Sequence, residues 1–194
     1  MRRSPEAAEA EILDAARELL AKGGLQELAV SSVMEHTSMQ RSAFYHYFAD
    51  RSALLGRLLE LIEDEGIEEA SSWLLGEEGG PALLAEALHS SVNAYLAHGD
   101  VLRAAHIASF QDEEIRRLYR HKMLQEFMDA VALRIHAENQ AGRASVADPE
   151  TVAQALVLMN SGITMELLGG EAEGSQESVI ETIQQIWVRA IYGG

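Results

Sequence analysis

The chain has 194 residues, no cysteine and a formal net charge of −16. This length fits one large domain, or a small domain joined to one of roughly 100 to 150 residues. The lack of cysteine excludes a disulfide framework, a thiolate metal site and a thiol nucleophile.

The acidity is unevenly distributed along the chain. Residues 1–60 hold seven basic and nine acidic residues, a formal charge of −2, whereas residues 61–194 hold eight and twenty-two, a charge of −14. Affinity for DNA depends largely on Lys and Arg that neutralise phosphates. The sequence therefore predicts that DNA is repelled everywhere except near Arg2, Arg3, Arg41 and Arg51.

The N-terminus carries no recognisable targeting segment. Its first ten residues contain two arginines but no apolar stretch, and no window approaches the roughly 18 apolar residues of a membrane span. We therefore expect a cytoplasmic protein without a membrane partner.

Apolar residues recur at helical spacing with almost no strand-like alternation, so the sequence predicts an all-α fold of about nine helices. The first helix has Ser4 as its N-cap and Pro5 at its first position, and Gly23 and Gly24 end it. Short helices follow at about 31–36 and 40–48, with a turn at 37–39 between them.

A long helix, capped by Asp50 or Ser52, is expected to run to about residue 75. Asp148 before Pro149 and Ser175 after a glycine-rich loop are further helix starts. The remaining helices are expected at about 81–97, 101–110, 112–139, 149–168 and 176–192.

The two short helices, with the sequence VSSVMEHTSMQRSAFYHYF, have the proportions of a helix-turn-helix. Val33, Met34, Met39 and Phe44 can pack inward, which leaves polar and aromatic residues exposed at the start of the second helix. Such groups suit the major groove of DNA. The alternative is an ordinary helical corner in which the tyrosines merely pack.

The segments AEILDAARELLAKGG and SAFYHYFADRSAL resemble the N-terminal signature of the TetR family of transcriptional regulators. The resemblance implies a helix-turn-helix DNA-binding domain over 1–52 and a ligand-binding and dimerisation domain over 53–194. It also implies a homodimer that binds double-stranded operator DNA. It places Phe44 and Phe48 in the core, and it implies these DNA-binding residues: Gln40, Arg41, Ser42, Tyr45, Tyr47 and Arg51.

Two positions depart from the family pattern. Ser38 stands where the family usually has glycine in the turn, and Ala29 stands where it usually has a Thr or Ser that caps the second helix. Ser32 and Glu35 have the spacing of a capping box, which could replace the lost cap.

The segments LVLMNSGITMELLGGE and IETIQQIWVRAIYGG resemble the C-terminal end of a mycobacterial repressor of the same family. The resemblance implies a long apolar ligand tunnel in which Asn160 bonds the polar group of a lipophilic effector, while Val157 replaces a second asparagine. The candidate ligand-binding residues are Leu84, Leu88, Tyr95, Met123, Leu124, Phe127, Asn160, Met165 and Trp187.

A Met-rich apolar set is also what an ordinary core contains. Asn160 favours a pocket, because an amide on an apolar helix face must find a hydrogen-bond partner. The family forms its dimer interface from the last two helices, where Ala153, Ser161 and Gly162 would permit close approach unless they face the protomer's own core.

The sequence predicts no enzyme and no cofactor. Its seven histidines never fall at the i, i+4 spacing of a helical zinc pair, and it has no GxSxG, Walker or GxGxxG pattern. The acidic run at 63–65 is expected to be a solvated helix face. The predicted function is a ligand-responsive DNA-binding regulator, a repressor that a lipophilic molecule releases from its operator. The alternatives are an all-α ligand-binding or adaptor protein without a DNA role, and a helical enzyme.

Overall fold

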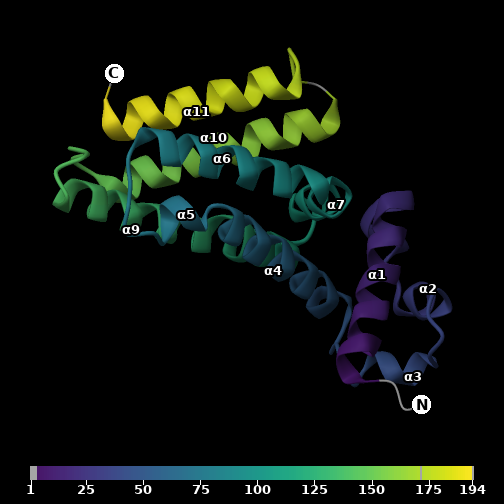
Figure 1. Cartoon of the computed structure of the whole chain (residues 1–194). Coiled ribbons are helices and arrows are strands. Elements are labelled where there is room, and N and C mark those ends of the chain that lie inside the picture. The colour runs from purple at the N-terminus through teal and green to yellow at the C-terminus, as the bar shows by residue number, and fades with distance from the viewer. Residues whose placement is uncertain (1–3, 171, 194) are drawn as a thin grey trace. The chain divides into compact units, whose positions relative to one another are not determined.

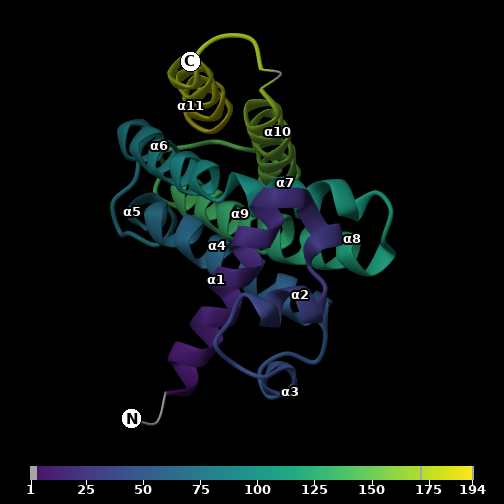
Figure 2. The same ribbon diagram turned by 90° about the vertical axis from the view of Figure 1, so that its right-hand side faces the viewer.

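The computed structural model describes residues 4–170 and 172–193, and every regular element in that part of the chain is helical (Figure 1 and Figure 2). The predicted all-α fold is confirmed. Arg2 and Arg3 lie outside the described residues. Internal contacts divide the chain into an N-terminal unit, residues 1–61 with 99–119, and a C-terminal unit, residues 62–98 with 120–194. The chain therefore passes between the two units three times.

The N-terminal unit is built around α1 (Pro5–Gly23), which packs against the second helix and α7. The apolar face of α1 is buried, and it includes Ile12, Leu13, Ala16, Leu19 and Leu20. Val33, Met34 and Phe44 are also buried, as predicted, while Met39 is half-buried. The other elements of this unit are η1 (Gly24–Glu27), α2 (Val30–Glu35), α3 (Arg41–Phe44), the first part of α4 (Arg51–Glu69), α7 (Gly99–Ser109) and α8 (Glu113–Arg120) up to residue 119.

The start of α2 differs from the prediction. Ala29 is its N-cap and provides no side-chain hydrogen bond. The expected replacement cap by Ser32 and Glu35 is wrong, because the helix already begins at Val30 and Ser32 therefore lies inside it. The backbone N–H groups at this end of α2 have no side-chain acceptor on the cap residue.

The turn between α2 and α3 is formed by hydroxyl hydrogen bonds. The Thr37 hydroxyl donates to the Met34 carbonyl at 2.9 Å and accepts from the Met39 amide at 3.2 Å. Ser38 donates its backbone N–H to the Glu11 carboxylate at 2.5 Å. No described residue other than glycine has a positive φ, so serine replaces the family's glycine here without a left-handed backbone.

The second helix of the motif is shorter than the predicted range 40–48, since regular α-helix covers only Arg41–Phe44. The chain continues in tighter turns, in which the Tyr47 amide donates to the Phe44 carbonyl at 3.0 Å. Phe44 and Phe48 are buried with ring centroids 5.6 Å apart, so the predicted core positions are occupied as expected.

The C-terminal unit is a bundle in which α10 packs on α9, α11 packs on α6, and α10 also touches both α6 and α11 (Figure 1). The predicted caps form, because Asp50 accepts from the Ala53 amide in the first turn of α4, Asp148 from Thr151 and Ser175 from Ser178. The elements of this unit are the second part of α4, α5 (Ser71–Leu74), α6 (Pro81–Ala97), the π-helical turn η2 (His121–Gln125), α9 (Glu126–Gln140), α10 (Pro149–Gly169) and α11 (Gln176–Tyr192).

Two predicted long helices are interrupted. The helix expected to reach residue 75 ends at Glu69, and α5 follows it as a separate turn. The helix expected over 112–139 is divided by the π turn η2 between α8 and α9. Glu69 and Ala70 at the first break and Leu124 and Gln125 at the second are good helix formers, so local propensity alone could not reveal the breaks.

The expectation that no window is apolar enough to span a membrane is wrong for α10. An 18-residue window of this helix has a mean hydropathy of 1.3, and 28% of it is buried within the chain. Asn160, Ser161 and Thr164 interrupt the apolar run without lowering its mean hydropathy below that of a spanning segment. One such helix is weak evidence for a membrane, and its uncovered apolar side needs another explanation.

The end of α11 is hydrogen-bonded to α5 and to the segment that joins α5 and α6. The Tyr192 hydroxyl oxygen accepts hydrogen bonds from Trp73 Nε1 at 2.7 Å and from the Gly80 amide at 3.2 Å. The guanidinium of Arg134 lies 5.7 Å from the centre of the Trp73 ring. These contacts make the last turn of α11 part of the bundle's core.

Candidate DNA-binding surface and ligand site

The residues predicted to contact DNA are largely exposed. Gln40, Arg41, Ser42 and Arg51 are exposed, and Tyr47 is half-buried. Tyr45 is 56% exposed, and only the edge of its ring meets Phe44, with centroids 5.5 Å apart. This does not fit an ordinary helical corner, in which Tyr45 would be packed. The contacts with DNA themselves remain a prediction.

Two arginines of this surface are not neutralised by the protein's own carboxylates. Within the described residues, Arg41 and Arg51 make no ion pair, whereas Arg57 pairs with both Glu9 at 3.2 Å and Glu60 at 2.8 Å. A guanidinium without an internal partner is free to bind a phosphate or a base edge in the bidentate way that arginine favours.

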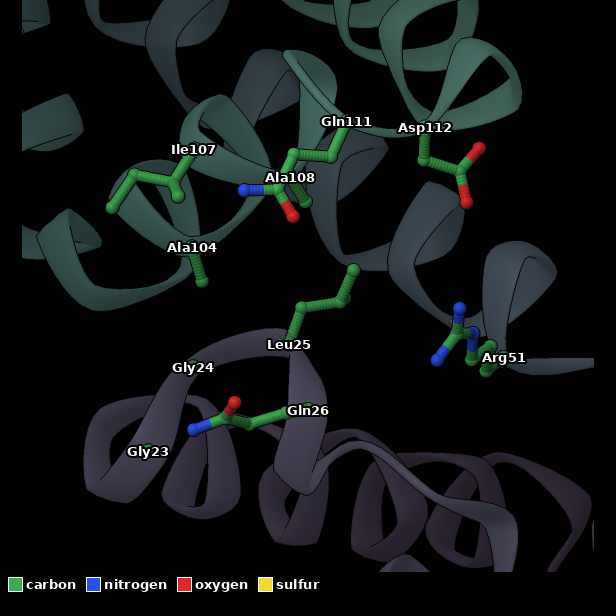
Figure 3. Close-up of a pocket in the computed structure, with 10 residues that line it drawn as sticks. All are labelled: Gly23, Gly24, Leu25, Gln26, Arg51, Ala104, Ile107, Ala108, Gln111 and Asp112. Carbon is green, nitrogen blue, oxygen red and sulfur yellow. The ribbon is translucent and has the colours of Figure 1, made fainter.

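Arg51 also stands at one end of a cleft of about 570 Å³ inside the N-terminal unit (Figure 3). Figure 3 shows Asp112 near Arg51, Gly23 and Ile107 toward the other end, and Leu25 reaching between. Asp112 caps α8 by accepting from the Glu114 amide at 2.9 Å. The cleft is open and contains none of the predicted ligand-binding residues, so the expected effector site lies elsewhere.

The predicted ligand-binding residues all belong to the C-terminal unit. Leu84, Leu88, Phe127 and Trp187 are part of one buried core, and Leu124 packs against it. Of the remaining predicted residues, Tyr95, Met123 and Asn160 are buried, and Met165 is half-buried. The set is therefore brought together largely as packed core, and a ligand would have to part flexible Met and Leu side chains to enter.

Five buried polar atoms in this unit lack a hydrogen-bond partner among the described residues, and three of them lie on helices α6, α10 and α11. These three are Asn160 Oδ1 on α10, Trp187 Nε1 on α11 and Ser91 Oγ on α6. The three helices that carry them contact one another pairwise. Unpaired buried polar atoms are unfavourable, so their concentration on these helices favours a site completed by a polar ligand.

Sequence reasoning missed Ser91. It is 2% exposed and lies three residues after Leu88 and four before Tyr95, which places it on the apolar face of α6. A serine at helical spacing between two predicted pocket residues was the signal that could have identified it.

Two smaller clefts in the C-terminal unit contain none of the predicted residues. One of about 390 Å³ lies where α10 ends and α11 begins, and includes Leu167 and Gln176. The other, of about 250 Å³, lies between α9 and the start of α10, and includes Met128 and Gln154. Across residues 4–170 and 172–193, no three His, Asp or Glu side chains gather as a candidate metal site.

Comparison with known proteins matches the N-terminal part of the chain to a DNA-binding family and the C-terminal part to the ligand-binding half of a regulator of that family. The profile of bacterial regulatory proteins of the tetR family matches residues 12–58, and that of the C-terminal domain of the transcriptional regulator EthR matches residues 84–193. The HTH-type transcriptional regulator EthR of Mycolicibacterium smegmatis is 30% identical over 95% of this chain and 86% of its own length. EthR of Mycobacterium tuberculosis is 27% identical over 94% of this chain and 86% of its own.

Solved structures show the same fold. A TetR-family transcriptional regulator from Syntrophomonas wolfei has a TM-score of 0.86 at 14% identity, with 96% of this chain and 95% of that chain covered. A transcriptional regulator from Pseudomonas aeruginosa has a TM-score of 0.77 at 20% identity, with 96% and 91% covered.

Proposed function

The chain belongs to the TetR family of bacterial transcriptional regulators and carries an EthR-type C-terminal domain, and from this premise we propose that it is a cytoplasmic repressor released from operator DNA by a lipophilic effector. That it is a ligand-responsive DNA-binding regulator follows from the family. The family is generally non-enzymatic, and the adaptor alternative finds no support.

The exposed start of α3 is the proposed reading surface. Gln40, Arg41 and Ser42 would face base edges in the major groove. Tyr45 would contact a base or a phosphate, and Tyr47 and Arg51 would contact phosphates. The unpaired guanidiniums support this assignment, because the strongly acidic remainder of the chain leaves few other places for DNA to bind.

The observation that carries the effector proposal is the unpaired Oδ1 of Asn160, an amide oxygen on a helix side chain that is 6% exposed. An amide oxygen accepts hydrogen bonds and its nitrogen donates them, so the side chain can orient a ligand of either kind. Trp187 and Ser91 each offer a further unpaired buried atom. The surrounding apolar core would accept the ligand's hydrocarbon body.

A homodimer explains the apolar side of α10 that the chain leaves uncovered, and this is why we do not propose a membrane partner. Leu158 on α10 is 41% exposed and Ile186 on α11 is 39% exposed. Gly162 is exposed with open space around its α-carbon, whereas Ala153 is fully buried in the protomer's core and takes no part. In the dimer, two recognition helices would reach major grooves roughly 34 to 36 Å apart.

The effector would act by shifting a population of conformations. α4 is one continuous helix that begins at Arg51 in the N-terminal unit and continues to Glu69 in the C-terminal unit. A ligand that binds the DNA-free form more tightly, by roughly 1 to 3 kcal/mol in ordinary allosteric systems, would lower operator affinity through this connection.

The test is to isolate the operator from genomic DNA with the purified protein, and then to follow its release by fluorescence anisotropy while lipophilic amides, esters and ketones are added. Asn160→Ala should weaken the effector response and leave operator affinity unchanged. Gln154→Ala, at an exposed position of the same helix, is the matched control. If ligands that occupy this unit in crystals never change operator affinity, the domain is a dimerisation scaffold and the proposal fails.

A further inference from the structure

Glu63, in the second part of α4, is a buried acid, and only one of its two carboxyl oxygens receives a hydrogen bond among the described residues. Its side chain is 1% exposed. Oε2 accepts a hydrogen bond from the Tyr95 hydroxyl at 3.2 Å, while Oε1 has no hydrogen-bond partner among the described residues. The sequence predicts a solvated helix face for the run at 63–65, and this prediction is wrong for Glu63.

One aromatic ring lies against this side of α4, and a second ring packs on the first. Gly66, one turn after Glu63, allows the Tyr95 ring to lie directly against the helix, because a Cβ at that position would overlap the ring. Phe127 meets Tyr95 edge to face, with ring centroids 6.5 Å apart. The unsatisfied carboxyl is therefore accompanied by rings whose faces attract cations.

The charges that act on Glu63 do not supply its missing partner. Asp64 on α4 and Glu126 on α9 act against its ionisation, and Lys122 on η2 acts in favour of it. Lys122 is itself paired with Glu126, Nζ to Oε1, at 3.3 Å. Burial is the largest influence and raises the pKa of the Glu63 carboxyl to about 8. Two acidic side chains and one lysine thus act on the Glu63 carboxyl, and its Oε1 receives no hydrogen bond among the described residues.

We propose that Glu63 anchors the ammonium group of a lipophilic amine, with Oε1 as the acceptor and the rings of Tyr95 and Phe127 beside the cation. This names the chemical class of the effector and rests on the proposed function. A carboxylate bound to an ammonium group would be charge-paired and hydrogen-bonded, the condition under which a buried charge is tolerated. An anionic ligand would instead meet three carboxyl groups.

Binding of the amine is coupled to release of a proton. Near pH 7 the Glu63 carboxyl holds its proton, because its pKa lies at about 8. When the ammonium group donates a hydrogen bond to Oε1, the carboxyl ionises and its proton leaves to solvent, so the pair that forms is ammonium and carboxylate. A neutral ligand of the same length would release none.

The experiment compares n-octylamine with 1-octanol, below their aggregation concentrations, in isothermal titration calorimetry at pH 7. Titrations in phosphate and in Tris give the number of protons released from the difference in heats. The proteins are the full chain, Glu63→Gln, which keeps the shape and an acceptor for Tyr95, and Glu68→Gln. The last makes the same change at an exposed position of the same helix, where the carboxylate does not act on Glu63.

We expect the full chain and Glu68→Gln to bind octylamine roughly tenfold to hundredfold more tightly than octanol, the range for a hydrogen bond to a charged group, with close to one proton released. Glu63→Gln should bind both ligands equally and release no proton. An unchanged amine preference in Glu63→Gln, or equal binding of both ligands to the full chain, would overturn the amine site. In either case the sensor function stands if octanol still releases the operator, and it fails too if no ligand does.

Discussion

Replacing the buried acid Glu63 with glutamine should change how stability depends on pH. The folded-state pKa of about 8 lies above the ordinary value of 4.5. The folded protein therefore holds this proton more tightly than the unfolded chain does. The resulting stabilisation is fully present below pH 4.5, declines as pH rises, and is lost once pH passes about 8.

The size of the effect follows from proton linkage. Between the two pKa values the slope is about 1.4 kcal/mol per pH unit for one proton. From pH 5 to pH 8 the wild-type protein should therefore lose about 3 to 4 kcal/mol at this site, a loss that Glu63→Gln does not suffer. Because the side chain is 1% exposed, solvent screening should reduce this little.

Urea denaturation followed by far-ultraviolet circular dichroism at pH 5, 6.5 and 8 measures this difference. The general repulsion within a chain of net charge −16 affects both proteins, so the comparison isolates the single site. Glu68→Gln removes a carboxylate from an exposed position of the same helix and should follow the wild-type profile. If Glu63→Gln and wild type lose stability in parallel, the buried proton does not exist and the reasoning is refuted.

Four further substitutions test the remaining assignments. Arg51→Ala should weaken binding to all DNA sequences and flatten the salt dependence of that binding. Arg41→Ala should relax discrimination at particular base pairs, by about 1 to 3 kcal/mol. If both variants behave alike on a panel of operator variants, these roles are contradicted. Leu158→Arg should turn the dimer into a monomer in analytical ultracentrifugation, since it places a charge on an apolar interface; an unchanged sedimentation coefficient would remove this face from the interface. Tyr192→Phe should lower the free energy of unfolding by about 1 to 3 kcal/mol, because the Trp73 and Gly80 donors lose their acceptor; an unchanged value in urea would show that solvent replaces it.

Helix starts were the most predictable part of the fold. Ser4, Asp148 and Ser175 each accept a hydrogen bond from the backbone N–H three residues later, as their residue types and the following prolines or acids indicate. Such caps depend on residues adjacent in sequence. The breaks after Glu69 and at η2 fall in segments without proline, so neither a helix breaker nor helix propensity disclosed them.

The candidate site was predictable in its apolar members and not in its acid. Leu84, Leu88 and Trp187 follow helical periodicity and are buried. Glu63 follows the same periodicity, four residues after Leu59. Its charge and its acidic neighbours nevertheless led to the prediction that its side chain is exposed to solvent. The partner that explains its burial, Tyr95, is thirty-two residues away and becomes visible only in the folded chain.

The position of the tryptophans makes the two units separable by spectroscopy. The chain has two, Trp73 and Trp187, and both are buried in the C-terminal unit, at 1% and 0% exposed. Light at 295 nm excites tryptophan selectively, so its emission during unfolding reports that unit alone, whereas circular dichroism reports the helices of both. Coincident curves would mean that the three crossings of the chain make the units unfold together, and separated curves would mean that the DNA-binding unit melts on its own.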